Sequence, residues 1–123
     1  MTTTKFTTSR FLDYRVYQES KNHLISLVSM KGALQEDQNM YDTLIKNATN
    51  TIMSIVTASG KLPEEAKNHL KNSIANAQKV IATLDIMTDL EIIDPEEFQD
   101  LKDDYTGTII QLKGFIRALG SKK

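Results

Sequence analysis

The chain has 123 residues, of which 40% are hydrophobic and 25% are charged, and its formal net charge is −1. This length suits one domain with a single core, and the composition is ordinary for a globular protein. The lack of cysteine excludes disulfides and thiolate metal sites. The near-neutral charge does not match a globally basic nucleic-acid-binding protein, although assembly of several copies can create a local basic surface.

The sequence has few glycines and prolines, and its apolar runs are short. Five glycines and two prolines are too few for a turn-rich, multi-stranded fold. The longest apolar runs fall far short of the ~20 residues that a membrane span requires. Residues 1–9 are rich in threonine, with no apolar signal core behind them. We therefore expect a cytoplasmic protein without membrane contact, whose residues 1–9 form a flexible polar tail.

Charge is unevenly distributed along the sequence. Residues 1–61 carry seven Lys or Arg against five Asp or Glu, and residues 91–106 carry one Lys against seven acids. Residues 107–123 carry four basic residues and no acid. Solvated helix faces, with acids near a helix N-terminus, are one explanation of this pattern. A binding surface formed on assembly is the other.

Two helices are predicted in the first half of the chain. One spans about 10–31 and ends at Gly32, and the next spans about 37–59 and ends at Gly60, because glycine terminates helices readily. Both have apolar residues at helical spacing. The side chains expected to face the core are Tyr14, Tyr17, Leu24, Leu27, Val28, Tyr41, Leu44, Ile45, Ala48, Ile52, Ile55 and Val56.

Two longer helices are predicted in the second half, over about 63–89 and 95–119. The boundary between them is well marked: Asp94 is a strong N-cap, Pro95 fits the first helical position, and Glu97 stands where a capping-box partner belongs. Each helix has a narrow apolar seam that needs a partner helix. The seam residues are Leu70, Ile74, Ala77, Ile81, Leu84 and Thr88, then Phe98, Leu101, Tyr105, Thr108, Leu112, Phe115 and Leu119.

Short connections between helices of this length favour antiparallel neighbours. The predicted fold class is all-α, an up-down-up-down antiparallel four-helix bundle over residues 10–120, followed by a basic tail at 121–123. Some apolar residues lie beyond the seams. They belong either to wide stripes within the bundle or to a second stripe used in self-association. The candidate oligomer-interface residues are Val80, Met87, Ile109, Ile110 and Ile116.

The sequence has no arrangement typical of catalysis, cofactor binding or metal binding. His69 follows Glu65 by four residues, whereas carboxylate-bridged di-metal bundles need a Glu-x-x-His pair on each of two helices. The acids of 96–104 lack the alternating spacing and the glycine of an EF-hand. No Ser-His-Asp set, phosphate-binding glycine loop or zincin motif occurs. We predict a protein that is not an enzyme and has no catalytic residues, no cofactor and no metal.

Contact with nucleic acid would depend on scattered basic side chains. Lys67 and Lys71 are four residues apart and therefore share one side of a helix. No strand motif with interleaved aromatics and no zinc finger accompanies them. The candidate nucleic-acid-binding residues are Arg10, Arg15, Lys21, Lys46, Lys67, Lys71 and Lys79.

Several segments, in order along the chain, are similar to motifs of one bacterial family. Residues 11–18 (FLDYRVYQ) resemble F-x-D-L-x-V-W-Q, with Tyr17 in the tryptophan position, and residues 44–48 (LIKNA) resemble Q-I-R-R-A. Residues 89–98 (DLEIIDPEEF) resemble D-L-G-Y-I-S-x-E-E-Y, and residues 112–119 (LKGFIRAL) resemble L-x-x-L-I-x-x-L. On these segments the chain resembles the four-helix-bundle family of rRNA intervening-sequence proteins and of Avd, the accessory protein of diversity-generating retroelements.

The resemblance implies a non-enzymatic homo-oligomer, typically a pentamer, and in the retroelement branch binding of a reverse transcriptase and its template RNA. Asn47 replaces the second arginine of the family's basic pair, so that Lys46 alone is basic there. One hypothesis is an adaptor that binds RNA, DNA or a nucleic-acid enzyme through the weak basic faces of several copies acting together. The alternative is a protein–protein interaction scaffold with no nucleic-acid role.

Overall fold

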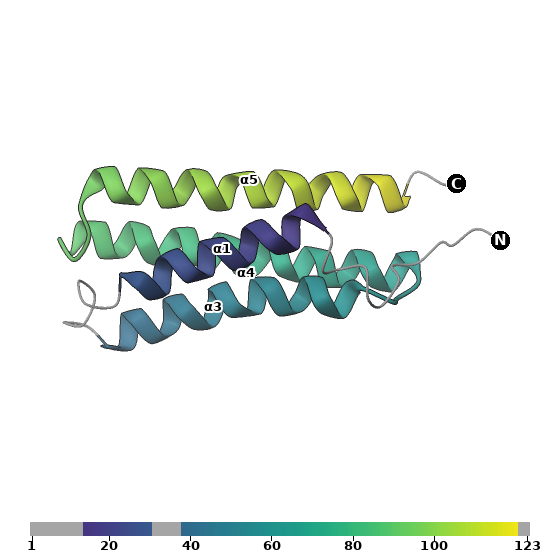
Figure 1. Ribbon diagram of the computed structural model, residues 1–123, viewed down its shortest axis with the longest axis horizontal. Coiled ribbons are helices and arrows are strands. Elements are labelled where there is room, and N and C mark those ends of the chain that lie inside the picture. The colour runs from purple at the N-terminus through teal and green to yellow at the C-terminus, as the bar shows by residue number, and fades with distance from the viewer. Residues whose placement is uncertain (1–13, 31–37, 121–123) are drawn as a thin grey trace.

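The computed structural model describes residues 14–30 and 38–120, and these residues form four helices that lie side by side along one direction (Figure 1). They are α1 (Arg15–Ser29), α3 (Gln38–Ala58), α4 (Pro63–Asp89) and α5 (Pro95–Gly120). Helix α4 packs between α3 and α5, and α1 completes the ring by contacting α3 and α5. This arrangement confirms the predicted all-α, up-down-up-down four-helix bundle. Within the described ranges, no helix has both the length and the apolar character needed to cross a membrane.

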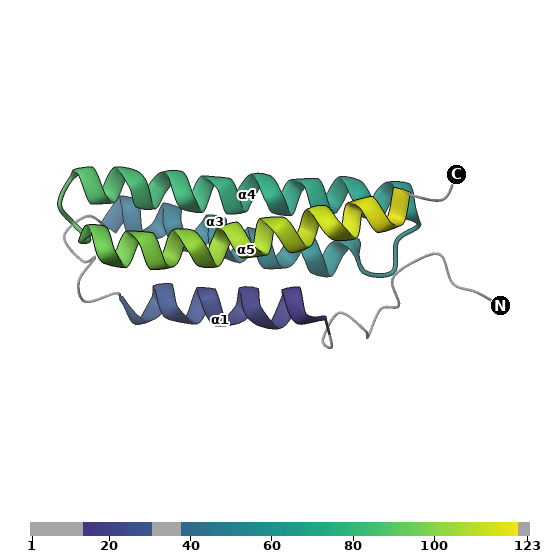
Figure 2. The ribbon, with the colours of Figure 1, turned by 90° about the horizontal axis from the view of Figure 1, so that it is seen from above.

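The helix ends lie close to those predicted, except at the start of α1. Helix α3 ends at Ala58, one residue before the predicted end at residue 59, while its predicted first residue, 37, lies outside the described residues, and α4 ends at Asp89 as predicted. Helix α1 begins at Arg15, while the predicted start at Arg10 and both predicted tails lie outside the described residues. At 15 residues α1 is much shorter than the others, and it runs along only part of their length (Figure 2).

The core consists of two clusters of buried side chains that follow one another along the bundle. The first lies toward the α4–α5 turn and includes Leu44, Leu84 and Tyr105, whereas the second lies toward the other end and includes Leu70 and Leu112. Buried polar residues separate the two clusters on α3 and α4. There the Ser73 hydroxyl donates a hydrogen bond to the Thr51 carbonyl oxygen at 2.6 Å, linking α4 to α3.

Most of the predicted seams are confirmed, whereas the assignment of Val28 to the core is wrong. Val80 and Met87, named as oligomer-interface candidates, are completely buried in the first cluster, so for them the alternative of a wide stripe within the bundle is the correct one. The reason is that α4 is contacted on two sides, by α3 and by α5, so that its buried arc is wide. Val28, predicted to face the core, is 46% exposed, and Val16 and Ser20 are buried on α1 instead. Fully or nearly fully buried seam residues include Leu70, Ala77, Leu84, Leu101, Tyr105, Thr108 and Leu112.

The turn between α4 and α5 is built as the sequence predicts. The backbone N–H of Glu97 donates to the side-chain oxygen of Asp94 at 3.0 Å, which is the N-cap hydrogen bond. Ile93, next to the cap, is buried in the first cluster, and Phe98 packs against the same cluster. Glu91 in this turn has a φ of 63°, a left-handed conformation that favours glycine.

Replacing Asp94 with alanine should lower the free energy of unfolding by about 1 kcal/mol, because the cap to the Glu97 N–H is lost. Urea denaturation followed by circular dichroism measures this change. Asp100→Ala removes an exposed acid from the same helix without touching the cap, and it serves as the control. Equal losses in the two variants would show that the cap contributes nothing.

Candidate functional site

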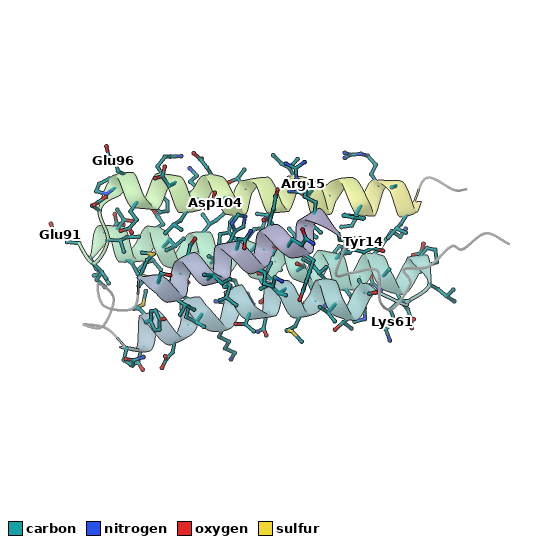
Figure 3. The ribbon with its side chains drawn as sticks, viewed as in Figure 1. Tyr14, Arg15, Lys61, Glu91, Glu96 and Asp104 are labelled. Carbon is teal, nitrogen blue, oxygen red and sulfur yellow. The ribbon has the colours of Figure 1, made fainter. Side chains whose placement is uncertain are left out.

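Charged side chains are segregated along the α4–α5 hairpin. Residues 85–104, around the turn, carry nine acids and one base. Figure 3 shows Glu91 and Glu96 at this end of the bundle and Lys61 toward the other end. From residue 105 onward the sequence has basic residues and no acid. The bundle therefore has an acidic end, formed by residues 85–104, and an opposite end that we call the basic end, where the charged residues at the end of α5 are all basic and residues 61–71, around the start of α4, carry three lysines beside Glu64 and Glu65.

Four basic residues at the basic end lie on neighbouring helices. Because a Cβ added to Gly120 would lie 3.3 Å from the Nζ atom of Lys67, the last turn of α5 lies beside the first turns of α4. The two helices are antiparallel, so residues 113–117 of α5 lie level with about residues 70–74 of α4. We call this set the basic strip; it consists of Lys67, Lys71, Lys113 and Arg117.

The contacts between α5 and α1 indicate which side of α5 bears Lys113 and Arg117. Gln111 and Asp104 of α5 reach side chains of α1. Lys113 follows Gln111 by two residues, about 200° around the helix, and Arg117 lies near the same side as Lys113. Both residues are exposed on the side of α5 away from α1, with Lys113 toward the α4 flank and Arg117 toward the outward side of the helix. On α4, the Lys67 side chain is 20% exposed and its ammonium pairs with the carboxylate of the exposed Glu64 at 2.9 Å, whereas Lys71 is exposed.

The basic strip has the chemistry of a phosphate-binding surface. Lysine ammonium groups bind phosphate as point charges, and a guanidinium can do so with two parallel hydrogen bonds. Arg117 also lies in the last turn of α5, where cations are favoured by the helix dipole. Four cations within about 10 Å along the bundle axis can therefore follow successive phosphates of a nucleic-acid backbone.

The structure brings two of the predicted nucleic-acid-binding residues, Lys67 and Lys71, into the strip and leaves the others apart. The Arg15 guanidinium forms an ion pair with Glu19 at 2.7 Å. The Lys21 ammonium lies 5.2 Å from the centre of the Tyr17 ring. Arg10 lies outside the described residues. Lys46 and Lys79 are exposed, on α3 and α4, on the acidic side of the Thr51–Ser73 contact.

Sequence reasoning did not assign Lys113 and Arg117 to nucleic-acid contact. The signal that could have found them is the C-terminal stretch 107–123, which has four basic residues and no acid. Of the residues predicted at an oligomer interface, Ile110 is 64% exposed. Ile109 and Ile116 are half-buried against the two core clusters.

A polar seam joins α1 to α5. The Gln111 side-chain amide donates a hydrogen bond to the Glu19 carboxylate at 2.7 Å. The Arg15 guanidinium bonds the same carboxylate, and together Arg15 and Gln111 hold the pKa of Glu19 below its ordinary value. Farther along α1, the His23 Nδ1 lies 3.8 Å from an Asp104 carboxylate oxygen. These contacts fix how α1 lies on α5.

His23 is the residue of the polar seam whose protonation is governed by burial. Its ring lies 5.4 Å from the ring of Tyr105, centre to centre, and its side chain is 15% exposed. Burial lowers the pKa of His23 below 6.5 and outweighs the opposing attraction of Asp104 and Glu19. Burial also raises the pKa of Tyr105. His23 is therefore neutral at pH 7, with its ring packed inside the seam.

Stability should fall as the pH drops below about 6.5, because the unfolded chain then binds a proton at residue 23 more readily than the folded bundle does. The free energy that neutral His23 contributes to the stability of the fold is fully present above the pKa that His23 has in the unfolded chain, and it is lost as the pH decreases below that value. Urea denaturation at pH 7.5 and 5.5, compared between the wild type and His23→Gln, measures it. We expect a smaller difference between the two pH values in the variant, and an unchanged difference would refute this assignment.

The carboxylates at the acidic end line an open hollow at the α4–α5 turn, together with Thr88, Ile92, Ile93 and Pro95. Its acidic lining residues are Asp89, Glu91, Asp94 and Glu97. In residues 14–30 and 38–120, no group of three or more His, Cys, Asp or Glu side chains is placed to hold a metal ion.

Fold and surface together define a four-helix bundle whose two ends differ in charge. No family model, no curated protein and no solved structure matches the chain.

Proposed function

We propose that the chain is a non-catalytic, self-associating adaptor that binds nucleic acid, or an enzyme acting on nucleic acid such as a reverse transcriptase, through the basic strip. The observation that carries this proposal is the juxtaposition of four basic residues on α4 and α5 at the end opposite the acidic end, where they outnumber the two acids of the first turn of α4, Glu64 and Glu65. The resemblance of the sequence to the family of rRNA intervening-sequence proteins and Avd implies the same class of function.

The mechanism is electrostatic and multivalent. One strip of four cations binds a polyanion weakly, and several copies in one assembly bind it together at a high effective concentration. The acidic end adds direction to this binding. Because the carboxylates of residues 85–104 repel phosphate, the bundle approaches a polyanion with its basic end first.

A second candidate function is a protein–protein scaffold with no nucleic-acid role. The observation in its favour is the acidic end, where residues 85–104 carry nine acids that would attract a basic protein surface. This alternative predicts no retention of RNA at any salt concentration. The two proposals are therefore separated by one binding measurement.

The test is a titration of a fluorescent RNA duplex with the purified protein at 50 and 200 mM salt. If all four cations of the strip contact phosphate, affinity should fall roughly 100-fold between these concentrations. Light scattering on the same sample measures self-association. Absence of binding at 50 mM salt would overturn the nucleic-acid proposal, and binding that does not depend on salt would overturn the role of the strip.

A further inference from the structure

The outer face of α5 has an ordered pattern of side chains. Asp103, Gly107, Ile110, Gly114 and Arg117 follow one another in steps of four and three, so they lie on one stripe of the helix. This stripe is opposite the side that buries Leu101, Tyr105 and Leu112 against the bundle. We call it the α5 outer face. Its order is acid, glycine, isoleucine, glycine and base, with Ile110 at the centre.

Nothing in the described bundle requires the two glycines. A Cβ added to Gly107 or to Gly114 would meet nothing within 4 Å. Glycine is unfavourable inside a helix relative to alanine, and its use is to let another backbone approach closely. Between them Ile110 is 64% exposed, the most exposed large apolar side chain of the described residues. The face is thus shaped for a second helix.

We propose that two copies of the chain associate through their α5 outer faces, with the two α5 helices antiparallel about a two-fold axis at Ile110. This inference deepens, and rests on, the self-association in the proposed function. Asp103 and Arg117 each lie seven residues from Ile110, or two turns and about 10.5 Å, on opposite sides. In the antiparallel pair, Asp103 therefore faces the partner subunit's Arg117, and the symmetry makes this ion pair twice.

Charge complementarity selects this partner and this orientation. The half of α5 before Gly107 is acidic and the half after Ile110 is basic, so an antiparallel copy sets each half against its opposite. A parallel copy would set acid against acid. Antiparallel helix dipoles also attract each other. Arg117 belongs to both surfaces, so in the pair it is engaged by the partner subunit's Asp103, and each copy binds phosphate with Lys67, Lys71 and Lys113.

Cysteine crosslinking tests the symmetry, because the natural chain has no cysteine. In Ile110→Cys the two introduced thiols meet across the axis, and mild oxidation should give a disulfide-linked dimer. Met53→Cys places a thiol at another exposed site, on α3, and should stay monomeric on a non-reducing gel. Failure of the residue-110 variant to link, or equal linking in both variants, would overturn the proposal. If the copies instead formed a head-to-tail ring, the two thiols at residue 110 would not meet, and no disulfide-linked dimer would form.

Charge exchange tests the register of the pair. Asp103→Arg and Arg117→Asp should each weaken self-association at least about tenfold in Kd, since each variant creates two like-charge contacts. The double variant restores both ion pairs in reversed order and should recover the dimer in sedimentation velocity. A double variant as weak as the single ones would overturn the register.

Self-association and RNA binding can be separated with Ile110, which is not part of the basic strip, whereas Arg117 belongs to both surfaces and its variant reports on self-association only. Ile110→Glu leaves the basic strip intact and should be a monomer that still binds RNA through one strip. If the wild type binds RNA but does not dimerise, the α5 proposal fails and RNA binding stands. If it dimerises through α5 but binds no RNA, the nucleic-acid part of the proposed function fails and the dimer stands.

Discussion

Replacing Leu84 with alanine should lower the free energy of unfolding by about 2–5 kcal/mol. Leu84 is completely buried in the first core cluster, where residues of α3, α4 and α5 meet. Removing its isobutyl group loses the transfer free energy of the buried atoms and leaves a cavity that the packed helices fill only partly. A loss of this size is a large share of the stability of an ordinary domain.

The same substitution at Leu90 is the control. Leu90 follows the last residue of α4 and is 56% exposed, so Leu90→Ala should change the free energy of unfolding by less than about 0.5 kcal/mol. Urea denaturation of the two variants, analysed with a common slope, gives the comparison. A Leu84→Ala loss no larger than that of Leu90→Ala would contradict the packing described here.

Reversing two charges of the basic strip should weaken RNA binding strongly. Lys67→Glu and Lys71→Glu, combined in one variant, remove two phosphate contacts and add two repulsive charges, so affinity should fall at least about tenfold. The slope of log affinity against log salt concentration should also become shallower, by the amount that about two phosphate contacts contribute to it. Neither side chain lies in the core clusters, so the helical circular dichroism should be retained.

The matched control changes the net charge equally at sites away from the strip. Lys46 and Lys79 are both exposed, on α3 and α4, and Lys46→Glu with Lys79→Glu gives the same total charge. This variant should bind RNA within about threefold of the wild type, because only long-range, salt-screened repulsion is added. Equal losses in the two double variants would mean that net charge, and not the basic strip, governs binding.

The helices could be predicted from the sequence because local signals mark their ends. Asp94, Pro95 and Glu97 define the start of α5 through cap chemistry that acts within one turn. The burial of Val80 and Met87 could be given only as one of two alternatives, because it depends on how many helices surround α4. A periodic pattern gives the direction of a buried face, whereas its width is set by neighbours distant in sequence.

The candidate surface was predictable only in part for a similar reason. The spacing of Lys67 and Lys71 places them together within one helix. Their proximity to Lys113 and Arg117 arises from the antiparallel pairing of α4 with α5, which no local spacing reveals. The Glu19–Gln111 hydrogen bond likewise joins residues far apart in the chain.

The central claim is that the partner of this bundle is a polyanion bound at its basic end. Titration of isotope-labelled protein with an RNA duplex, followed by amide chemical shifts, tests it most directly. We expect salt-dependent shift changes concentrated in residues 61–74 and 110–120, with residues 85–104 unaffected. Changes centred on the acidic end, or no changes at low salt, would contradict the account.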